Sequence, residues 1–514
     1  MLTLVEGGTV VTGINPGETR EGWDILIDGG RIAAMGPGLR AGLAGPAETI
    51  DARRSIVMPG LINAHLHSNE AFEQGATDAL PLELWRLRSY PPFGVAPLTE
   101  EDYYLRALMA GIQSIRAGVT TVQDDVINPA ATPESVDGVC RAYRELGLRA
   151  WVTTSLGDRG LIESHPFLAQ MMSAEVRAML GPDRPKPAAE QMALFERNYE
   201  TWNGAGGGRI RINLGPRGPQ RCTAGLLERI AAASAARGCA VHTHVLETRT
   251  QAVTAQLEHG KTLIAYMEDL GLLTPRLTIN HGIWLTDADI GLLGEHGCAV
   301  THNPLSNLKI GSGVCRVRAL LDAGVAVALG TDGLATSDTA DLTAALRVAA
   351  LIHRTGSPRF AEWVTAHEAF GMATEAGARS GLMADEVGRL APGRRADLIL
   401  LDRDHWGFVP LNDPVAQLAF SVPSEAVHSV IVDGSVVMRD RKILTIDEAQ
   451  VRGAIAEAAE RWRRDVKPKA WAAADALFPA MTRMYDEAMH AFATEDWARA
   501  YAVHDGSGQG EGGR

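Results

Sequence analysis

Eight short apolar or β-branched runs alternate with helix-forming stretches in the middle of the chain, and this alternation restricts the possible folds more than any other feature of the sequence. A strand followed by a helix, repeated along a chain, is typical of a parallel sheet covered by helices. Eight such units fit a TIM-type (β/α)8 barrel, in which reactive residues lie where strands end. The candidate strands are 61–67, 118–125, 149–156, 209–216, 239–245, 276–282, 298–304 and 325–332. We therefore predict an α/β fold with a barrel over residues 58–384.

Two β-rich segments flank the predicted barrel. Residues 1–57 and 385–445 both contain short strand-like runs separated by Gly-containing turns such as Asn-Pro-Gly, Pro-Gly and Asp-Gly. This texture is typical of antiparallel strands. We predict that the two segments, although far apart in the chain, build one small sheet domain.

Two further segments lie outside these units. Residues 157–208 are longer than one crossover helix requires, and two interpretations stay open: they shape access to the barrel mouth, or they add a packing pair of helices. Residues 446–514 are predicted to form a helical extension with two amphipathic helices. Its last residues, 506–514, are too rich in Gly to pack and are predicted to be disordered.

The charge of the chain argues against nucleic acid as a partner. Its 49 Lys and Arg residues oppose 62 Asp and Glu residues, for a net charge of -13, and no dense basic tract is present. The N-terminus lacks the basic and apolar regions of a secretory leader, and no apolar run reaches about 18 residues, so we expect a cytoplasmic protein with no membrane partner. Five scattered cysteines without a CxxC pair agree with buried thiols in a reducing compartment.

Two histidine pairs stand at the ends of predicted strands. His65 and His67 end the first strand, and His242 and His244 end the fifth. At a spacing of two, the side chains of a strand point to the same face. Roughly 0.4 such pairs are expected by chance in a chain of this length and histidine content, so one pair alone favours packed core histidines.

Further polar groups recur at the other strand ends. Glu247 follows the fifth strand, His281 ends the sixth, His302 the seventh and Asp332 the eighth. Random core histidines have no reason to gather where barrel enzymes place their chemistry. Three neutral imidazoles and one carboxylate, with an open position for water, suit a catalytic Zn²⁺ ion and are also acceptable to Fe²⁺.

The chain resembles the amidohydrolase superfamily, and within it the metal-dependent aminohydrolase branch of cytosine, guanine and S-adenosylhomocysteine deaminases and triazine hydrolases. The segments that carry this resemblance occur in the family's order and are MPGLINAHLH, HTHVLET, NHGIWLTDADI, THNPLSNLKIGSG and LGTDG. The resemblance covers nearly the whole chain up to about residue 445. It implies a distorted (β/α)8 barrel with a small β-sandwich built from both ends of the chain.

The resemblance also implies roles for individual residues. The metal would be held by His65, His67, His244 and Asp332, while Glu247 and His281 would handle protons and the developing oxyanion. Other branches bridge two metals with a carboxylated lysine at the end of the fourth strand. That strand has no lysine here, so we expect one divalent ion per chain, Zn²⁺ in the first instance.

Such a site predicts a hydrolase that acts on carbon–nitrogen bonds other than peptide bonds. Zn²⁺ lowers the pKa of bound water from near 15.7 to about 7, which makes hydroxide available at neutral pH. Our main hypothesis is deamination, or removal of a substituted amine, from a small nitrogen-rich heterocycle, guanidine or urea derivative. The alternatives are release of halide or cleavage of an amide or carbamate at the same site, and a non-catalytic scaffold of the same fold.

Trp85 and Trp284 are candidates for stacking on a flat heterocycle, although Trp near a barrel rim more often packs. Arg217 and Arg221, after the fourth strand, are candidates for holding a carboxylate, although such arginines more often form surface ion pairs. This segment departs from the HAPYT-like or HSPYT-like run of many relatives, which puts nucleoside and thioadenosine substrates in doubt.

Three residues after the seventh strand have two open interpretations. His302 either lines the pocket or supports the neighbouring loop. Ser306 and Asn307 either stabilise that loop through hydrogen bonds or contact the substrate. The helical tail, together with the habit of the family, also suggests a homodimer or a higher homo-oligomer.

Overall fold

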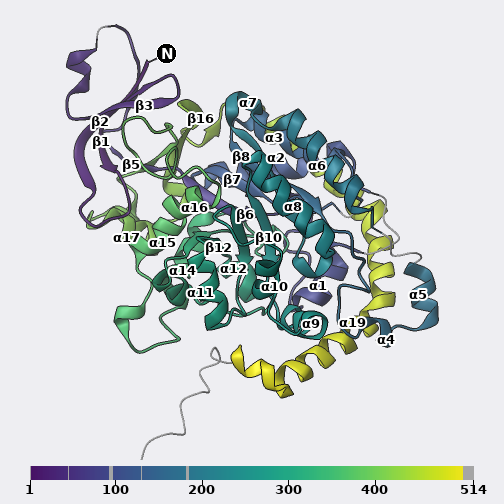
Figure 1. The fold of residues 1–514 in the computed structure, drawn as a ribbon. Coiled ribbons are helices and arrows are strands. Elements are labelled where there is room, and N and C mark those ends of the chain that lie inside the picture. Colours follow the sequence, from purple (N-terminus) through teal and green to yellow (C-terminus); the bar gives the residue numbers. More distant parts are fainter. Residues whose placement is uncertain (1, 44, 92–96, 129, 181–184, 502–514) are drawn as a thin grey trace, which may run out of the picture.

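The computed structural model describes residues 2–43, 45–91, 97–128, 130–180 and 185–501 (Figure 1). Its centre is an eight-stranded parallel sheet in which neighbouring strands follow one another in the chain. The strands are β6 (Leu61–Leu66), β7 (Val119–Asp124), β8 (Arg149–Leu156), β9 (Ile210–Pro216), β10 (Val241–Val245), β11 (Leu277–His281), β12 (Ala299–His302) and β13 (Ala326–Leu329). The eight predicted strands are thus confirmed, with their ends shifted by a few residues. Their apolar runs are buried throughout, as expected for a parallel sheet covered by helices.

Hydrogen bonds between the first and last strands bring the barrel close to closure. The amide of Asp332 donates to the carbonyl of His65 over 2.9 Å. The Asn63 amide group donates to the Thr331 hydroxyl over 2.8 Å and accepts from the Thr331 backbone over 3.0 Å. The segment after β13 is therefore fixed directly beside β6.

The helices that follow the strands pack around this barrel. Several begin at a threonine whose side chain caps the first turn: Thr99 pairs with Asp102, and Thr286 with Asp289, in reciprocal capping boxes. The helices of this layer are α1 (Leu82–Ser89), α2 (Glu100–Arg116), α3 (Glu134–Leu146), α8 (Ala224–Arg237), α9 (Arg249–His259), α10 (Leu263–Asp269), α11 (Asp287–Glu295), α12 (Pro304–Lys309), α13 (Val317–Asp322), α14 (Leu342–Ile352), α15 (Ala366–Met372) and α16 (Glu375–Ser380).

Both ends of the predicted barrel lead into a second, nine-stranded mixed sheet. Its strands are β1 (Leu2–Val11), β2 (Thr19–Asp28), β3 (Arg31–Gly36), β4 (Glu48–Asp51), β5 (Ser55–Pro59), β14 (Leu398–Asp402), β15 (Val427–Val432), β16 (Ser435–Arg439) and β17 (Lys442–Ile443). β5 pairs with β14, which joins the N-terminal and C-terminal segments (Figure 1). The prediction that two distant β segments build one sheet is confirmed. Helix α17 (Pro414–Phe420) lies between β14 and β15 in the chain.

The inserted segment and the C-terminal extension are both helical. The insertion carries α4 (Leu168–Met171), α5 (Ala174–Leu180), α6 (Ala188–Trp202) and α7 (Ala205–Gly208). The extension carries α18 (Glu448–Arg461) and α19 (Lys467–Thr494), which are joined by a π-helical turn at Trp462–Val466. α19 packs against α1, α4 and α9. The predicted disorder of 506–514 lies outside the described residues.

All five cysteines are buried and none forms a disulfide. This agrees with the expectation that they pack as small apolar side chains. Within the described ranges, no helix has the length and apolar character needed to cross a bilayer.

A buried ion pair ties the barrel to the second sheet. Arg149, the first residue of β8, donates to both carboxylate oxygens of Asp397 over 2.8 and 3.0 Å, and both side chains are at most 2% exposed. Asp397 also accepts from the backbone of Asp433 over 2.7 Å. Because a buried charge without its partner is costly, this contact locks the two sheets together.

We predict that Asp397→Asn lowers the free energy of unfolding by about 3 kcal/mol, because it leaves the Arg149 guanidinium buried with a poorer partner. The measurement is urea denaturation followed by circular dichroism. Glu48→Gln, which removes an exposed ion pair with Arg439, is the matched control and should change stability by less than about 1 kcal/mol. Equal effects of the two substitutions would contradict a structural role of the buried pair.

Candidate metal centre

Six polar side chains predicted from the sequence meet at the carboxyl end of the barrel strands. They are His65, His67, His244, Glu247, His281 and Asp332, and each is at most 9% exposed. The backbone at three strand ends is bent into the left-handed region, with φ of 52° at Leu246, 70° at His281 and 66° at Asp332. Non-glycine residues adopt this conformation at a cost, and such strain is common where side chains are aimed at a site.

The donor atoms of four of these side chains lie at the corners of a small polyhedron. Asp332 Oδ1 lies 3.3 Å from His65 Nε2 and 3.2 Å from His67 Nε2. His67 Nε2 lies 3.2 Å from His244 Nε2. Ligands bonded to one tetrahedral ion at 2.0–2.1 Å are separated by about 3.3–3.4 Å, so the spacing fits a shared cation.

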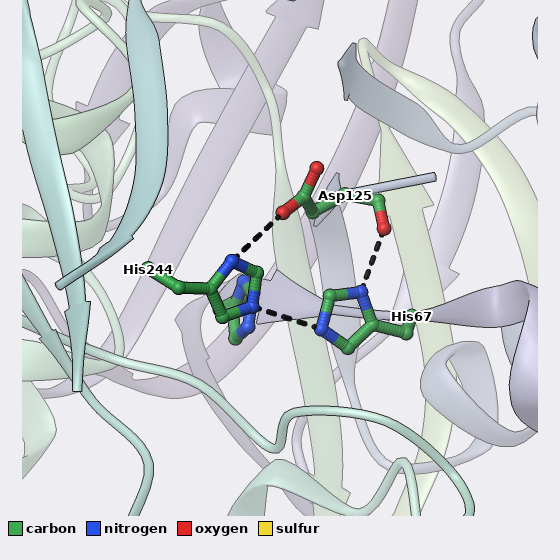
Figure 2. A group of neighbouring side chains, drawn as sticks. His67, Asp125 and His244 are labelled. Atoms are coloured by element: carbon green, nitrogen blue, oxygen red, sulfur yellow. Dashed lines mark hydrogen bonds and ion pairs between the residues drawn. The ribbon is translucent and has the colours of Figure 1, made fainter. Parts of the chain in front are cut away.

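The opposite ring nitrogens of the histidines are held by other groups. His67 Nδ1 donates to the backbone carbonyl of Asp125 over 2.6 Å, and this contact points Nε2 toward His244 (Figure 2). His65 Nδ1 lies 2.9 Å from His242 Nε2, and His244 Nδ1 lies 3.4 Å from the Asp125 carboxylate. Contacts of this kind orient metal-binding imidazoles in proteins.

The electrostatics of the cluster favour a positive charge at its centre. Burial lowers the pKa of His65 to about 3, so this ring is neutral and able to donate a lone pair. Burial also lowers the pKa of His67, but the carboxylates of Asp332, Glu70 and Asp125 outweigh that effect and raise it to about 9. The surrounding negative charge thus attracts a cation.

The buried polar atoms provide a test of whether a metal fits. Within the described part of the chain, His65 Nε2 and His281 Nε2 are buried and have no hydrogen-bond partner. Buried polar atoms without partners are rare, and here they face neighbouring imidazole and carboxylate donors. His65, His67, His244 and Asp125 bring one donor atom each within 4.8 Å of one another, as do His65, His281 and Asp332. The residues present therefore fit a divalent metal ion.

Groups able to move protons lie beside this cluster. His281 Nε2 is 3.8 Å from Glu247 Oε1 and 3.9 Å from Asp332 Oδ2. Asn307 Oδ1 lies 2.9 Å from His281 Nδ1, and the Ser306 hydroxyl donates to Asp332 Oδ2. Burial, with the charges of Asp332 and Glu83, raises the pKa of Glu247 well above its usual range. These effects favour the protonated form of Glu247.

The cluster forms one end of a cleft at the carboxyl end of the barrel strands. The cleft is lined by residues that follow β6, β8, β9, β10 and β13, by α1 and by α9. Its lining includes His67, Glu70, Glu83, Trp85, Arg86, Tyr90, Ser164, His165, Arg217, Arg221, His244, Glu247, Gln251, His281 and Asp332. Ser164 and His165 belong to the inserted segment, which thus contributes to the wall as well as packing helices around the barrel.

The structure separates the candidate substrate contacts into two groups. Trp85, Arg217 and Arg221 line the cleft. Trp284 does not: its ring packs against Phe492 with 5.3 Å between ring centres, and Nε1 donates to the Ser312 carbonyl over 3.0 Å. Trp284 thus has packing contacts in this structure, and its stacking on a substrate stays a prediction.

The residues after the seventh strand also lie outside the cleft lining. His302 is buried with its Nε2 3.3 Å from that of His353, so it supports the barrel wall. Ser306 donates to Asp332, and Asn307 accepts from His281. These hydrogen bonds agree with the interpretation that the two side chains stabilise the loop.

Several residues of the metal cluster and the cleft were missed from the sequence. Asp125 ends the run GVTTVQDD, so its position at a strand end was the available signal. Glu70, Glu83 and Arg86 stand in the segment after the first strand, where no periodic pattern distinguishes them. His165, in the inserted segment, lies in the cleft wall without any sequence pattern that marks it.

A near-closed parallel barrel with polar donors at the strand ends defines the class of metal-dependent barrel hydrolases. The sequence profile of the Amidohydrolase family matches residues 56–437. The chain belongs to this family, which confirms the resemblance drawn from its motifs. It is a metal-dependent hydrolase that acts on carbon–nitrogen bonds.

Characterised relatives span most of the chain. A 5-methylthioadenosine/S-adenosylhomocysteine deaminase of Desulforudis audaxviator is 35% identical over 83% of this chain and 92% of its own length. A 5'-deoxyadenosine deaminase of Methanosarcina mazei is 32% identical over 86% of this chain and 94% of its own length.

Solved structures show the same fold. An adenosine deaminase from Xanthomonas campestris with bound zinc has a TM-score of 0.79 at 27% identity, covering 90% of this chain and 98% of that one. An atrazine chlorohydrolase from Arthrobacter aurescens complexed with zinc has a TM-score of 0.80 at 27% identity, covering 89% of this chain and 100% of that one.

We predict that His67→Ala lowers bound zinc below about 0.2 equivalents per chain after dialysis, because the remaining donors no longer surround the ion. Metal content would be measured by plasma mass spectrometry. His259→Ala is the control, since His259 stacks on Tyr266 away from the cleft. Full zinc retention by His67→Ala would show that the cluster is not the metal site.

Proposed function

We propose that the protein is an aminohydrolase with one Zn²⁺ ion per chain, which removes ammonia or a substituted amine from a small nitrogen-rich heterocycle. The observation that carries this proposal is the position of the buried Glu247 carboxyl, whose Oε1 lies 3.8 Å from His281 Nε2 and beside the metal cluster. An amine leaving group needs a proton, and this carboxyl is placed to supply one.

His65, His67, His244 and Asp332 would hold the ion. β9 contains no lysine, so the chain lacks the bridging group that a second metal uses in other branches. Asp332 Oδ1 lies 3.3 Å from His65 Nε2 and 3.2 Å from His67 Nε2, and His67 Nε2 lies 3.2 Å from His244 Nε2. These distances match the edges of one tetrahedron, which supports a single position for the ion. Zinc is favoured over iron by the zinc-bound relatives.

The bound ion would lower the pKa of a water molecule to about 7 and so supply a nucleophile. Asp332 Oδ2, which accepts from Ser306, is placed to take a proton from that nucleophile. His281 carries its hydrogen on Nδ1, toward Asn307, so its Nε2 is a proton acceptor. Once protonated, the same nitrogen donates to the oxygen that develops charge at the attacked carbon.

Glu247 would deliver the proton that the departing group requires. Its pKa is raised by burial first and then by the neighbouring charges of Asp332 and Glu83, and both effects favour the neutral acid over the carboxylate. It would protonate a ring nitrogen as the carbon is attacked, and then the leaving amine.

The similarity of the chain to deaminases of adenosine derivatives supports a heterocyclic substrate. Trp85 contributes an aromatic wall, and its Nε1 donates to the Ala335 carbonyl over 3.2 Å, which fixes the ring. The atrazine chlorohydrolase shares the fold, so halide release is the alternative outcome that an assay has to separate.

We predict that Glu247→Gln slows turnover by about 10²-fold or more, because the amide cannot deliver a proton, while zinc content stays unchanged. Steady-state rates on a responsive substrate and metal analysis are measured together. Glu145→Gln, on the surface of α3, is the control and should retain the wild-type rate. A rate unaffected by Glu247→Gln would remove this residue from the mechanism.

Activity should rise linearly with added Zn²⁺ and reach its plateau at one equivalent per chain when the metal-free protein is titrated. Released ammonia, amine and chloride are measured across adenosine derivatives, aminotriazines and chlorotriazines. Ammonia or amine release supports the proposal. A plateau at two equivalents would contradict the single ion, and chloride as the sole product would favour the alternative.

A further inference from the structure

A short helix, Ser68–Glu73, begins directly after the metal-binding His67 and connects the cleft with the C-terminal extension. Glu70, in the middle of this 68–73 helix, lines the cleft. Glu73, its last residue, is 5% exposed and accepts a hydrogen bond from Trp462 Nε1 of the extension. The proposed chemistry does not account for this contact between the extension and the segment beside the metal site.

Both ends of the π-helical turn Trp462–Val466 contact Glu73. Trp462 is the first residue of the turn, and Lys467 follows its last residue. Trp462 Nε1 donates to Glu73 Oε1, and Lys467 Nζ lies 2.9 Å from Glu73 Oε2. A π-helical turn is a rare irregularity within a helix and is frequent at functional sites. The buried Glu73 carboxylate is therefore held by two donors from one turn of the extension.

The Arg106 guanidinium lies between two aromatic rings. Arg106 comes from α2 and is 2% exposed. Its Cζ is 4.3 Å from the ring centre of Phe72 and 4.6 Å from that of Trp462. Its Nη1 donates to the Asn69 carbonyl over 2.7 Å, while Nε and Nη2 have no hydrogen-bond partner within the described residues. Because a buried charge is costly, the two ring faces matter for its stability, and Trp462 supplies one of them.

The 68–73 helix also fixes a carboxyl in the cleft. Asn69 Nδ2 donates to the Tyr90 hydroxyl over 3.0 Å, and this hydroxyl donates to Glu70 Oε1 over 2.6 Å. The Ile127 amide donates to Asn69 Oδ1 over 3.3 Å. A displacement of the helix would therefore move Glu70 relative to the cleft wall.

Glu70 in turn contacts the segment that follows Asp332. Its Oε2 accepts from the Ala335 amide over 3.2 Å. A Cβ on Gly333 would lie 1.8 Å from the same oxygen, so the carboxyl packs directly on this segment. The helix is thus connected to His67 through the chain and to the Asp332 segment through Glu70. Two of the four residues proposed to hold the ion therefore depend on its position.

We propose that Trp462 is a positioning residue of the metal site: by stacking on Arg106 and binding Glu73, it holds the 68–73 helix where His67 and Asp332 share one ion. The cleft lining does not include Trp462, so this side chain acts through the helix rather than on the substrate. The inference rests on the proposed function, since it assigns a role toward the same zinc site.

The test replaces zinc by Co²⁺, whose visible absorption depends on the number and geometry of its ligands. Spectra are recorded for the wild type, Trp462→Leu, Trp462→Phe and Glu73→Gln, each loaded with one equivalent of Co²⁺. The values of kcat and KM are measured with the zinc-loaded proteins on a compound that releases amine or ammonia. Urea denaturation establishes that each variant is folded under the assay conditions.

We expect Trp462→Leu to change the cobalt spectrum and to lower kcat by about 10-fold or more, with KM changed by less than about threefold, because small displacements of reacting groups are costly. Trp462→Phe keeps a ring on Arg106 and should restore most of the wild-type spectrum and rate. Glu73→Gln keeps the side-chain volume but removes the charge, and it should change the spectrum in the same direction as Trp462→Leu. If Trp462→Leu does not fold, the spectrum of Glu73→Gln decides.

Trp497→Leu is the matched control. Trp497 is a partly buried tryptophan of the same extension, and its ring packs with those of Phe492 and Tyr501. The substitution removes the same apolar group as Trp462→Leu at another position. It should leave the cobalt spectrum and kcat unchanged.

The outcomes separate this inference from the proposed function. A cobalt spectrum that is the same in the wild type, Trp462→Leu and Glu73→Gln overturns the positioning role, and so does an equal change in Trp497→Leu. Amine release by the wild type together with such an unchanged spectrum leaves the aminohydrolase proposal in place. A spectrum that changes with Trp462 and Glu73, without amine or ammonia release from any compound, upholds the positioning role and overturns the aminohydrolase proposal.

Discussion

The hydrogen bond from the Asp332 amide to the His65 carbonyl is the contact on which the rest of the site depends. It joins the segment after the last barrel strand to the first strand, so donors from the two ends of the barrel face each other. Gly330 makes this approach feasible, because a Cβ there would meet Asn303 Oδ1 at 2.4 Å and His65 Cβ at 2.8 Å. Without closure, His65 and His67 would lose the Asp332 carboxylate as a neighbour.

Much of this arrangement was predictable, because the information is local. Alternation of apolar strands with helices identified the eight barrel strands, and period-two spacing placed His65 and His67 on one face. A shared edge in a parallel barrel then brings strand-end residues together without any knowledge of their distance in the chain. The sheet built from both ends of the chain was predictable because Gly-containing turns separate its strands, and this signal is also local.

The remaining features depend on packing between segments and leave no periodic signal. Trp284 was a stacking candidate from its place near the barrel rim, but the sequence could not show that Phe492, from the far end of the chain, packs against its ring. Arg86 stands in a short helix whose register toward the cleft is set by tertiary contacts. Asp125 supports His67 through a backbone carbonyl, which any residue type provides, so its identity could not reveal that contact.

Helix α19 lies against α1 and α9, the two helices that furnish one wall of the cleft (Figure 1). The Asp475–Arg88 pair fixes α1 from behind, two residues from Arg86. A substitution on the outer helix can therefore tilt this wall by a fraction of an ångström while every reacting group stays in place. Substitutions in the C-terminal region can therefore change which substrates the cleft accepts during evolution, while the reacting groups stay the same.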